Sequence, residues 1–171
     1  MYTDKFYKED LLAMAKINIP KHLLVDILRE ITEFNEFRKD NPFPHESEVR
    51  AWLEREENMM TASGNMMGAP WLQSYGFCAA DFHLLQHEHL VELWNLGLNP
   101  LDSTTRLQVR AVGEKLNDIG GFKAMQFNFV VLQGIVSGGA ALGTARPRPA
   151  GVGAFAPFVS TCWSGVGEWM L

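Results

Sequence analysis

The charged side chains of this 171-residue sequence stop well before its end. The sequence holds 15 Lys and Arg and 20 Asp and Glu, but only Arg146, Arg148 and Glu168 fall within the last 38 residues. Glycine, alanine, proline and valine are abundant there instead. Because no charged coat keeps this segment in water, we expect it to be buried in the protein's own fold, in a partner or in a membrane, or to stay unfolded.

Composition narrows the class of protein. A content of 47% apolar and 20% charged residues is typical of a globular chain. The formal net charge of −5 argues against nucleic acid as the main partner, because phosphate binding needs a basic surface. Cys78 and Cys162 lack the spacing of a metal site and are expected to be free thiols. The N-terminal sequence has neither a secretory signal nor a transit peptide pattern, so we expect a cytoplasmic protein.

The spacing of apolar residues predicts an all-α fold. Apolar side chains recur at intervals of three and four, and prolines or glycines separate the segments in which they do so. The predicted helices cover residues 9–18, 21–39, 46–58, 79–96 and 104–119, and a sixth begins at Phe122. Residues 58–68 are predicted to be a flexible connector, and no regular structure is predicted over residues 150–171. We expect a single five- to six-helix, bundle-like domain over residues 1–133, with a Gly/Pro/Ala-rich, nearly uncharged tail over residues 134–171 packed on it or on a partner.

Two of these helices have a clear apolar stripe. In the helix over residues 104–119 the stripe consists of Leu107, Val109, Val112, Leu116 and Ile119. In the helix over residues 21–39 it consists of Leu24, Ile27, Leu28, Ile31 and Phe34. The opposite face of that helix is acidic and is either a solvated surface or a docking site for a basic partner; it carries Asp26, Glu30, Glu33 and Glu36.

Three interpretations of the tail remain open from the sequence. Residues 124–145 and 149–167 are two uncharged runs of membrane-spanning length, and the arginines between them would form a cytoplasmic turn. Alternatively, the small residues permit close packing, and the aromatic residues anchor the tail against the helical body or a partner. Finally, this composition also fits a segment that does not fold, such as a shifted or extended reading frame would encode.

Two histidines have a spacing that suits a metal. His83 and His87 are four residues apart, so on one continuous helix they share a face. Such a pair is half of many zinc sites and would bind a divalent metal such as zinc or iron. The alternative is a pair of hydrogen-bonded histidines at a contact between helices. A third metal ligand would have to come from elsewhere, and the candidates by type are Cys78, His45 and Glu48.

No catalytic constellation is recognisable, and this points to a non-enzymatic role. We expect a helical protein-interaction or adaptor subunit of a larger assembly, with another protein or a second copy as its partner. The side chains predicted to bind that partner are aromatic residues of the tail: Phe155, Phe158, Trp163 and Trp169. A metal-binding protein or metal-dependent hydrolase built on His83 and His87 is the second hypothesis. Membrane association through the tail is the third, and no cofactor other than a metal is expected.

Overall fold

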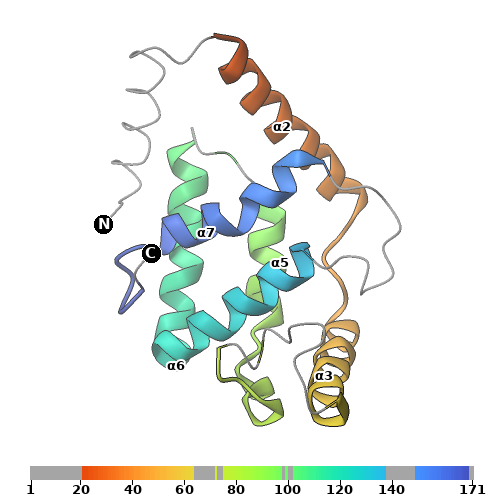
Figure 1. The fold of residues 1–171 in the computed structure, drawn as a ribbon. Coiled ribbons are helices and arrows are strands. Elements are labelled where there is room, and N and C mark those ends of the chain that lie inside the picture. Colours follow the sequence, from red (N-terminus) through yellow and green to blue (C-terminus); the bar gives the residue numbers. More distant parts are fainter. Residues whose placement is uncertain are drawn as a thin grey trace.

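The computed structural model describes residues 21–63, 72, 75–97, 99, 102–137 and 149–169, and these residues are mostly helical, with no strand among them (Figure 1). The expected all-α class is confirmed. In chain order the elements are α2 (Lys21–Asp40), α3 (Glu46–Ser63), the 3-10 helix η1 (Ala79–Leu84), α5 (His87–Leu96), α6 (Ser103–Ser137), the 3-10 helix η3 (Ala150–Ala154) and α7 (Phe155–Trp163). The helix expected over residues 9–18 lies outside the described residues.

The first two described helices begin and end close to where the sequence predicts. Pro42 and Pro44 separate them, and the polar groups of His45 cap α3: its carbonyl accepts the amide of Glu48 at 2.9 Å, and its own amide donates to the Glu48 carboxylate at 3.1 Å. However, α3 continues to Ser63 instead of ending near residue 58. The expected connector is therefore helical in its first part, because Met59 and Met60 are good helix formers once the turn before them is in place. Its remainder, residues 64–68, lies outside the described part of the chain.

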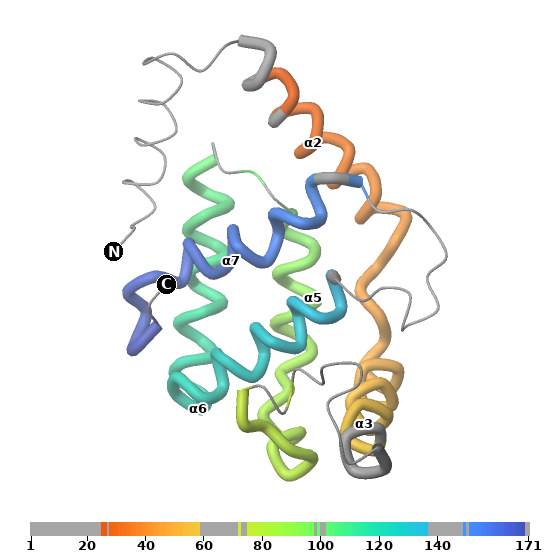
Figure 2. The backbone as a smooth tube through the Cα atoms, viewed as in Figure 1, coloured from red at the N-terminus to blue at the C-terminus, as the bar shows by residue number. Residues whose placement is uncertain are grey.

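A break at two glycines divides α6 into two straight halves. Gly120 and Gly121 have non-helical dihedral angles, and the φ of Gly121 is 68°, which strongly favours glycine. The two helices predicted on either side of this pair are thus confirmed, joined without an intervening loop. Figure 2 shows the chain changing direction at this point.

The apolar stripe of the first half of α6 is narrower than predicted. Val109, Val112 and Leu116 are buried, but Leu107 and Ile119 are 57% and 53% exposed. Leu107 lies two residues before Val109, which places it on the opposite side of the helix. Ile119 lies on the correct side but immediately before the glycine break, where the chain turns away.

The last part of the tail is folded, contrary to the expectation that it lacks regular structure. Residues 150–163 form η3 and α7, and α7 packs on α6. Glycine is a weak local signal for a helix, but it allows the close packing that stabilises one here. The boundary drawn at residue 133 falls inside α6, which continues to Ser137, and residues 138–148 lie outside the description.

Trp163 attaches α7 to α6. Its side chain is fully buried, and its indole Nε1 donates to the carbonyl of Val109 at 2.9 Å. The ring lies where a side chain of residue 113 would be, since a Cβ built on Gly113 would be 2.6 Å from Trp163 Cδ1. Arg110 completes the contact by donating to the carbonyls of Cys162 at 3.3 Å and Ser164 at 2.7 Å, at the end of α7.

An equivalent arrangement joins α2 to α5. Arg38 donates to the carbonyls of Trp94, at 3.2 Å, and Asn95. These are the two residues before Leu96, with which α5 ends. In return, Trp94 Nε1 donates to the carbonyl of Asn41 at 2.8 Å, just beyond α2. Gly97, with a φ of 75°, ends α5 against the Arg38 side chain.

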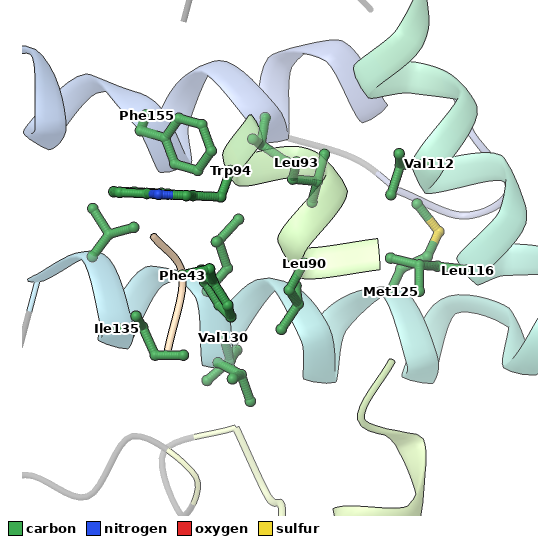
Figure 3. Close-up of a cluster of buried hydrophobic side chains, with 14 of the residues drawn as sticks. Phe43, Leu90, Leu93, Trp94, Val112, Leu116, Met125, Val130, Ile135 and Phe155 are labelled. Atoms are coloured by element: carbon green, nitrogen blue, oxygen red, sulfur yellow. The ribbon is translucent and has the colours of Figure 1, made fainter. Parts of the chain in front are cut away.

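One apolar core connects all of these helices. Phe34 of α2, Trp94 of α5 and Phe155 of α7 are in mutual contact, with ring centroids 5.4 to 5.6 Å apart. Figure 3 shows Phe155 lying over Trp94, with Val130 and Ile135 of α6 on the other side of the cluster. Side chains from both ends of the described chain therefore contribute to the same core.

Of the three interpretations of the tail, membrane spanning involved two uncharged runs, and the second of them, residues 149–167, is described almost whole. Residues 149–167 contain the short 3-10 helix η3 and the nine-residue α7, whereas a spanning helix needs about 20 residues. In the described residues, Ser103–Val136 of α6 has the length and composition of a spanning helix. However, 56% of its most apolar 18-residue segment is buried inside the protein. The glycine break also interrupts the helix.

Replacing Gly113 should reverse the usual effect of a glycine-to-alanine change in a helix. Such a change normally stabilises a helix by about 1 kcal/mol. In Gly113→Ala the added methyl group meets the Trp163 ring, so we expect a loss of about 1–3 kcal/mol in the free energy of unfolding. Chemical denaturation followed by tryptophan fluorescence measures it. Gln108→Ala, at an exposed position of the same helix, is the control and should change stability by less than about 0.5 kcal/mol.

Candidate functional site

The helix predicted over residues 79–96 is not continuous, and this alters the histidine pair. Leu85 and Gln86 have non-helical dihedral angles and separate η1 from α5. His83 is exposed in η1, where its Nδ1 donates to the carbonyl of Ala80 at 2.8 Å. His87 begins α5, and its Nε2 donates to the carbonyl of Pro44 at 2.7 Å. The two imidazoles therefore do not share one helical face, and the geometric premise of the metal prediction is wrong.

The buried amide of Asn128 binds the backbone on both sides of this break. Its Oδ1 accepts the amide of Gln86 at 2.8 Å. Its Nδ2 donates to the carbonyls of Leu84, at 2.9 Å, and Ala124, at 2.8 Å. The side chain is fully buried in the second half of α6. Asn128 thus supplies the polar partners that the backbone loses where the helix is interrupted.

The proposed third metal ligands are engaged elsewhere. The ring of His45 lies beside that of His87, with centroids 6.5 Å apart, but its Nδ1 accepts the amide of Ser47 at 3.2 Å and belongs to the cap of α3. Glu48 is part of the same cap, and Cys78 lies before η1. Within the described ranges, no group of three or more His, Cys, Asp or Glu side chains is arranged to hold a metal ion. Metal binding by His83 and His87 stays a prediction, which elemental analysis of tag-free protein can address.

Asp81 is the buried carboxylate of this region. Its Oδ2 accepts the amide of Cys78 at 3.0 Å, and its Oδ1 pairs with Lys123 Nζ at 3.1 Å. Burial acts to raise the pKa of Asp81, but the hydrogen bond from Cys78 and the ammonium of Lys123 together outweigh it, and the pKa lies below its usual value. The carboxylate therefore joins the start of η1 to α6 in its charged form.

The aromatic residues predicted to bind a partner lie inside the protein. Phe155, Phe158 and Trp163 of α7 and Trp169 after it are all buried by the chain's own residues. Trp169 contacts Trp163, with ring centroids 5.2 Å apart, and donates to the carbonyl of Ser160 at 3.1 Å. In this conformation these side chains are part of the core, and their binding of a partner stays a prediction.

A polar cleft of about 290 Å³ lies between α6 and the turn after α7. It is lined by Arg110, Glu114, Asn117, Asp118 and the residues Gly165, Val166 and Gly167. The Arg110 guanidinium already binds the carbonyls of α7, and the lining contains no nucleophile and no histidine. We find no catalytic arrangement in this cleft.

Two of the exposed large apolar side chains among the described residues lie one turn apart on α2. Val25 and Leu28 are 57% and 46% exposed, although α2 buries Ile31 and Phe34 further along. Figure 1 shows the first half of α2 at the outer edge of the described fold. In its second half, α2 packs on η3, where Gly151 lies directly against the carbonyl of Glu30.

The most acidic stretch of the sequence begins in α2 and continues through α3. Residues 25–58 contain ten Asp and Glu and five Lys and Arg, a balance of −5 that equals the net charge of the whole chain. On α2 the carboxylates of Glu30, Glu33 and Glu36 are exposed, as is the Asp26–Arg29 ion pair in part. The exposed apolar pair therefore lies near exposed carboxylates, although α2 as a whole, with five Asp and Glu and four Lys and Arg, is close to neutral.

Sequence reasoning missed the two polar groups that organise this region, Asn128 and Asp81. A single asparagine within the apolar run at residues 124–136 was the available signal, because a buried amide needs several polar partners. Asp81 followed by an apolar residue gave no comparable signal. Comparisons with known proteins add nothing further: no family model, no curated protein and no solved structure matches this chain.

Removing the side-chain amide of Asn128 should destabilise the break between η1 and α5. In Asn128→Leu the amide of Gln86 and the carbonyl of Leu84 are left buried without this partner, which costs about 1–3 kcal/mol for each such group. Denaturant unfolding should therefore show a loss of at least about 2 kcal/mol. Gln133→Leu, at an exposed position on the same helix half, is the control. Equal stability of the two variants contradicts this role for Asn128.

The paired Asp81 carboxylate predicts a contribution to acid sensitivity. Because its pKa is lowered in the folded protein, its stabilisation is present above the unfolded pKa, about 3.9, and is lost as the pH falls through the lower folded value. Asp81→Asn should therefore lower stability near pH 7 and weaken the pH dependence below about pH 4. Thermal unfolding across a pH series measures both effects. Glu114→Gln, an exposed carboxylate, should leave the profile unchanged.

Proposed function

We propose that the protein is a non-enzymatic helical subunit or adaptor that binds another protein through the outer face of α2. The observation that carries the proposal is the exposed pair Val25 and Leu28, which lies on a peripheral helix within the most acidic part of the chain. Apolar side chains surrounded by charged ones are typical of protein docking sites. We also infer that the described helices form one bundle-like domain that includes residues 149–169, and that this domain acts in the cytoplasm.

The chemistry of this face suggests the chemistry of its partner. The carboxylates of Glu30, Glu33 and Glu36 favour a segment that carries Lys or Arg. Val25 and Leu28 lie one helical turn apart and favour apolar side chains at the same spacing. A basic amphipathic helix combines the two properties, and it would bind with its apolar stripe on α2.

Introducing charged side chains at the apolar pair should weaken this binding. We expect Val25→Asp with Leu28→Asp to weaken the complex about tenfold or more, because central apolar contacts dominate such interfaces. Proximity labelling in the cells that express the protein identifies candidate partners, and titration calorimetry with each purified candidate measures the change in Kd. Leu107→Asp, which alters an equally exposed apolar residue on α6, is the matched control.

The salt dependence of the same titration tests the charge of the partner. Binding to the acidic face should weaken as the ionic strength rises, because exposed charges more than about 10 Å apart are screened at 0.1 M salt. If no candidate binds the purified wild type directly, or if the α2 variant and the Leu107 variant bind equally well, the proposed surface is wrong. Circular dichroism establishes that both variants keep their helical content.

A further inference from the structure

The glycine break in α6 separates the fold into two parts that depend on each other. Gly121 has a φ of 68° and a ψ of −158°, a combination that is essentially restricted to glycine. The two helical halves meet at this pair with no loop between them. Domain exchange is favoured by short connections of this kind, because one continuous helix can replace the connection and carry the following segment to another molecule.

The contacts that close the fold cross this break. Trp163, after the break, binds the Val109 carbonyl and the surface of Gly113, both before it. Asn128, after the break, binds the backbone of Leu84 and Gln86, before it. The same surfaces are present in a second copy of the chain, so each part after the break can bind the part before the break of another molecule.

We propose that α6 straightens at Gly120–Gly121 and that the protein then forms a dimer by exchanging the segment that follows. In the dimer each Trp163 occupies the Gly113 surface of the other copy, and each Asn128 binds the other copy's backbone at Leu84 and Gln86. Nearly all contacts are retained, and the closed and exchanged forms differ mainly at the hinge. This inference goes beyond the proposed function, since it identifies a second copy as a partner independently of α2.

The side chain beside the hinge supports the straight form. Ile119 is 53% exposed in the closed chain, immediately before Gly120. A continuous α6 of 35 residues would be about 52 Å long, at 1.5 Å per residue. Two such helices in an exchanged dimer cross near their hinges, and there we expect each Ile119 to be covered by the other copy.

Substitution of both glycines tests the hinge in the full-length protein. Alanine favours a continuous helix at both positions and is strained at the φ of Gly121, so Gly120→Ala with Gly121→Ala should lower the dimer dissociation constant about a hundredfold or more. Light scattering coupled to gel filtration should show twice the monomer mass. Gly153→Ala, at an exposed position with no atom near the added methyl group, is the control and should match the wild type. A folded, monomeric double variant overturns the proposal.

A second experiment keeps the wild-type hinge and does not require the double variant to fold. The chain with Trp163→Ala lacks the ring but keeps the surface at Gly113, whereas the chain with Gly113→Phe keeps the ring but lacks the surface. The two chains are unfolded and refolded together. In the mixed dimer, Trp163 of the second chain lies on Gly113 of the first, which is the native contact. At the other contact, the alanine at position 163 of the first chain faces the phenylalanine at position 113 of the second. Native mass spectrometry should detect the mixed dimer, with a higher unfolding temperature than either chain alone. Absence of a mixed dimer overturns the proposal.

Discussion

Trp163 lies directly against the backbone of α6 because residue 113 has no side chain. This single contact allows an uncharged segment, poor in local helical signals, to become part of the core. Once the ring is in place, its indole hydrogen is satisfied by Val109, and the end of α7 is satisfied by Arg110. The remaining aromatic residues then pack around it, with Phe129 and Trp169 in contact with the same ring.

The same exchange of groups occurs twice in the fold. In each case an arginine of one helix donates to carbonyls at the C-terminal end of a second helix. A tryptophan of the second helix in turn donates to a backbone carbonyl of the first helix or of the residue that follows it. Arg38 and Trp94 join α2 to α5 in this way, and Arg110 and Trp163 join α6 to α7. Each pair satisfies polar groups at a helix end and buries a large ring, so helix termination and core packing depend on the same side chains.

The sequence predicts those parts of the fold that depend on local signals. Apolar spacing and prolines place α2 and the start of α3, and the pair Gly120–Gly121 marks the division of α6, because a few adjacent residues decide each of these features. The break at Leu85 and Gln86 is different: its hydrogen bonds come from Asn128, 42 residues further along, so no local pattern reveals it. The helix in the tail was missed for a related reason, since the packing surface that stabilises it is supplied by α6. The continuous helix assumed for the two histidines was wrong for the same reason, whereas their metal binding stays a prediction. The exposed face of α2 could be located only when its neighbours were known.

The contact between Phe34 and Phe155 has a consequence for the order of folding. These rings are 121 residues apart in the chain, yet they share one cluster with Trp94. During synthesis α2 and α5 leave the ribosome long before α7 exists, so the apolar faces that α7 later covers are exposed to solvent for that interval. Closure of long chain segments also slows folding relative to helical proteins with mainly local contacts. Transiently exposed apolar surface of this kind makes a nascent chain prone to aggregation until α7 is complete.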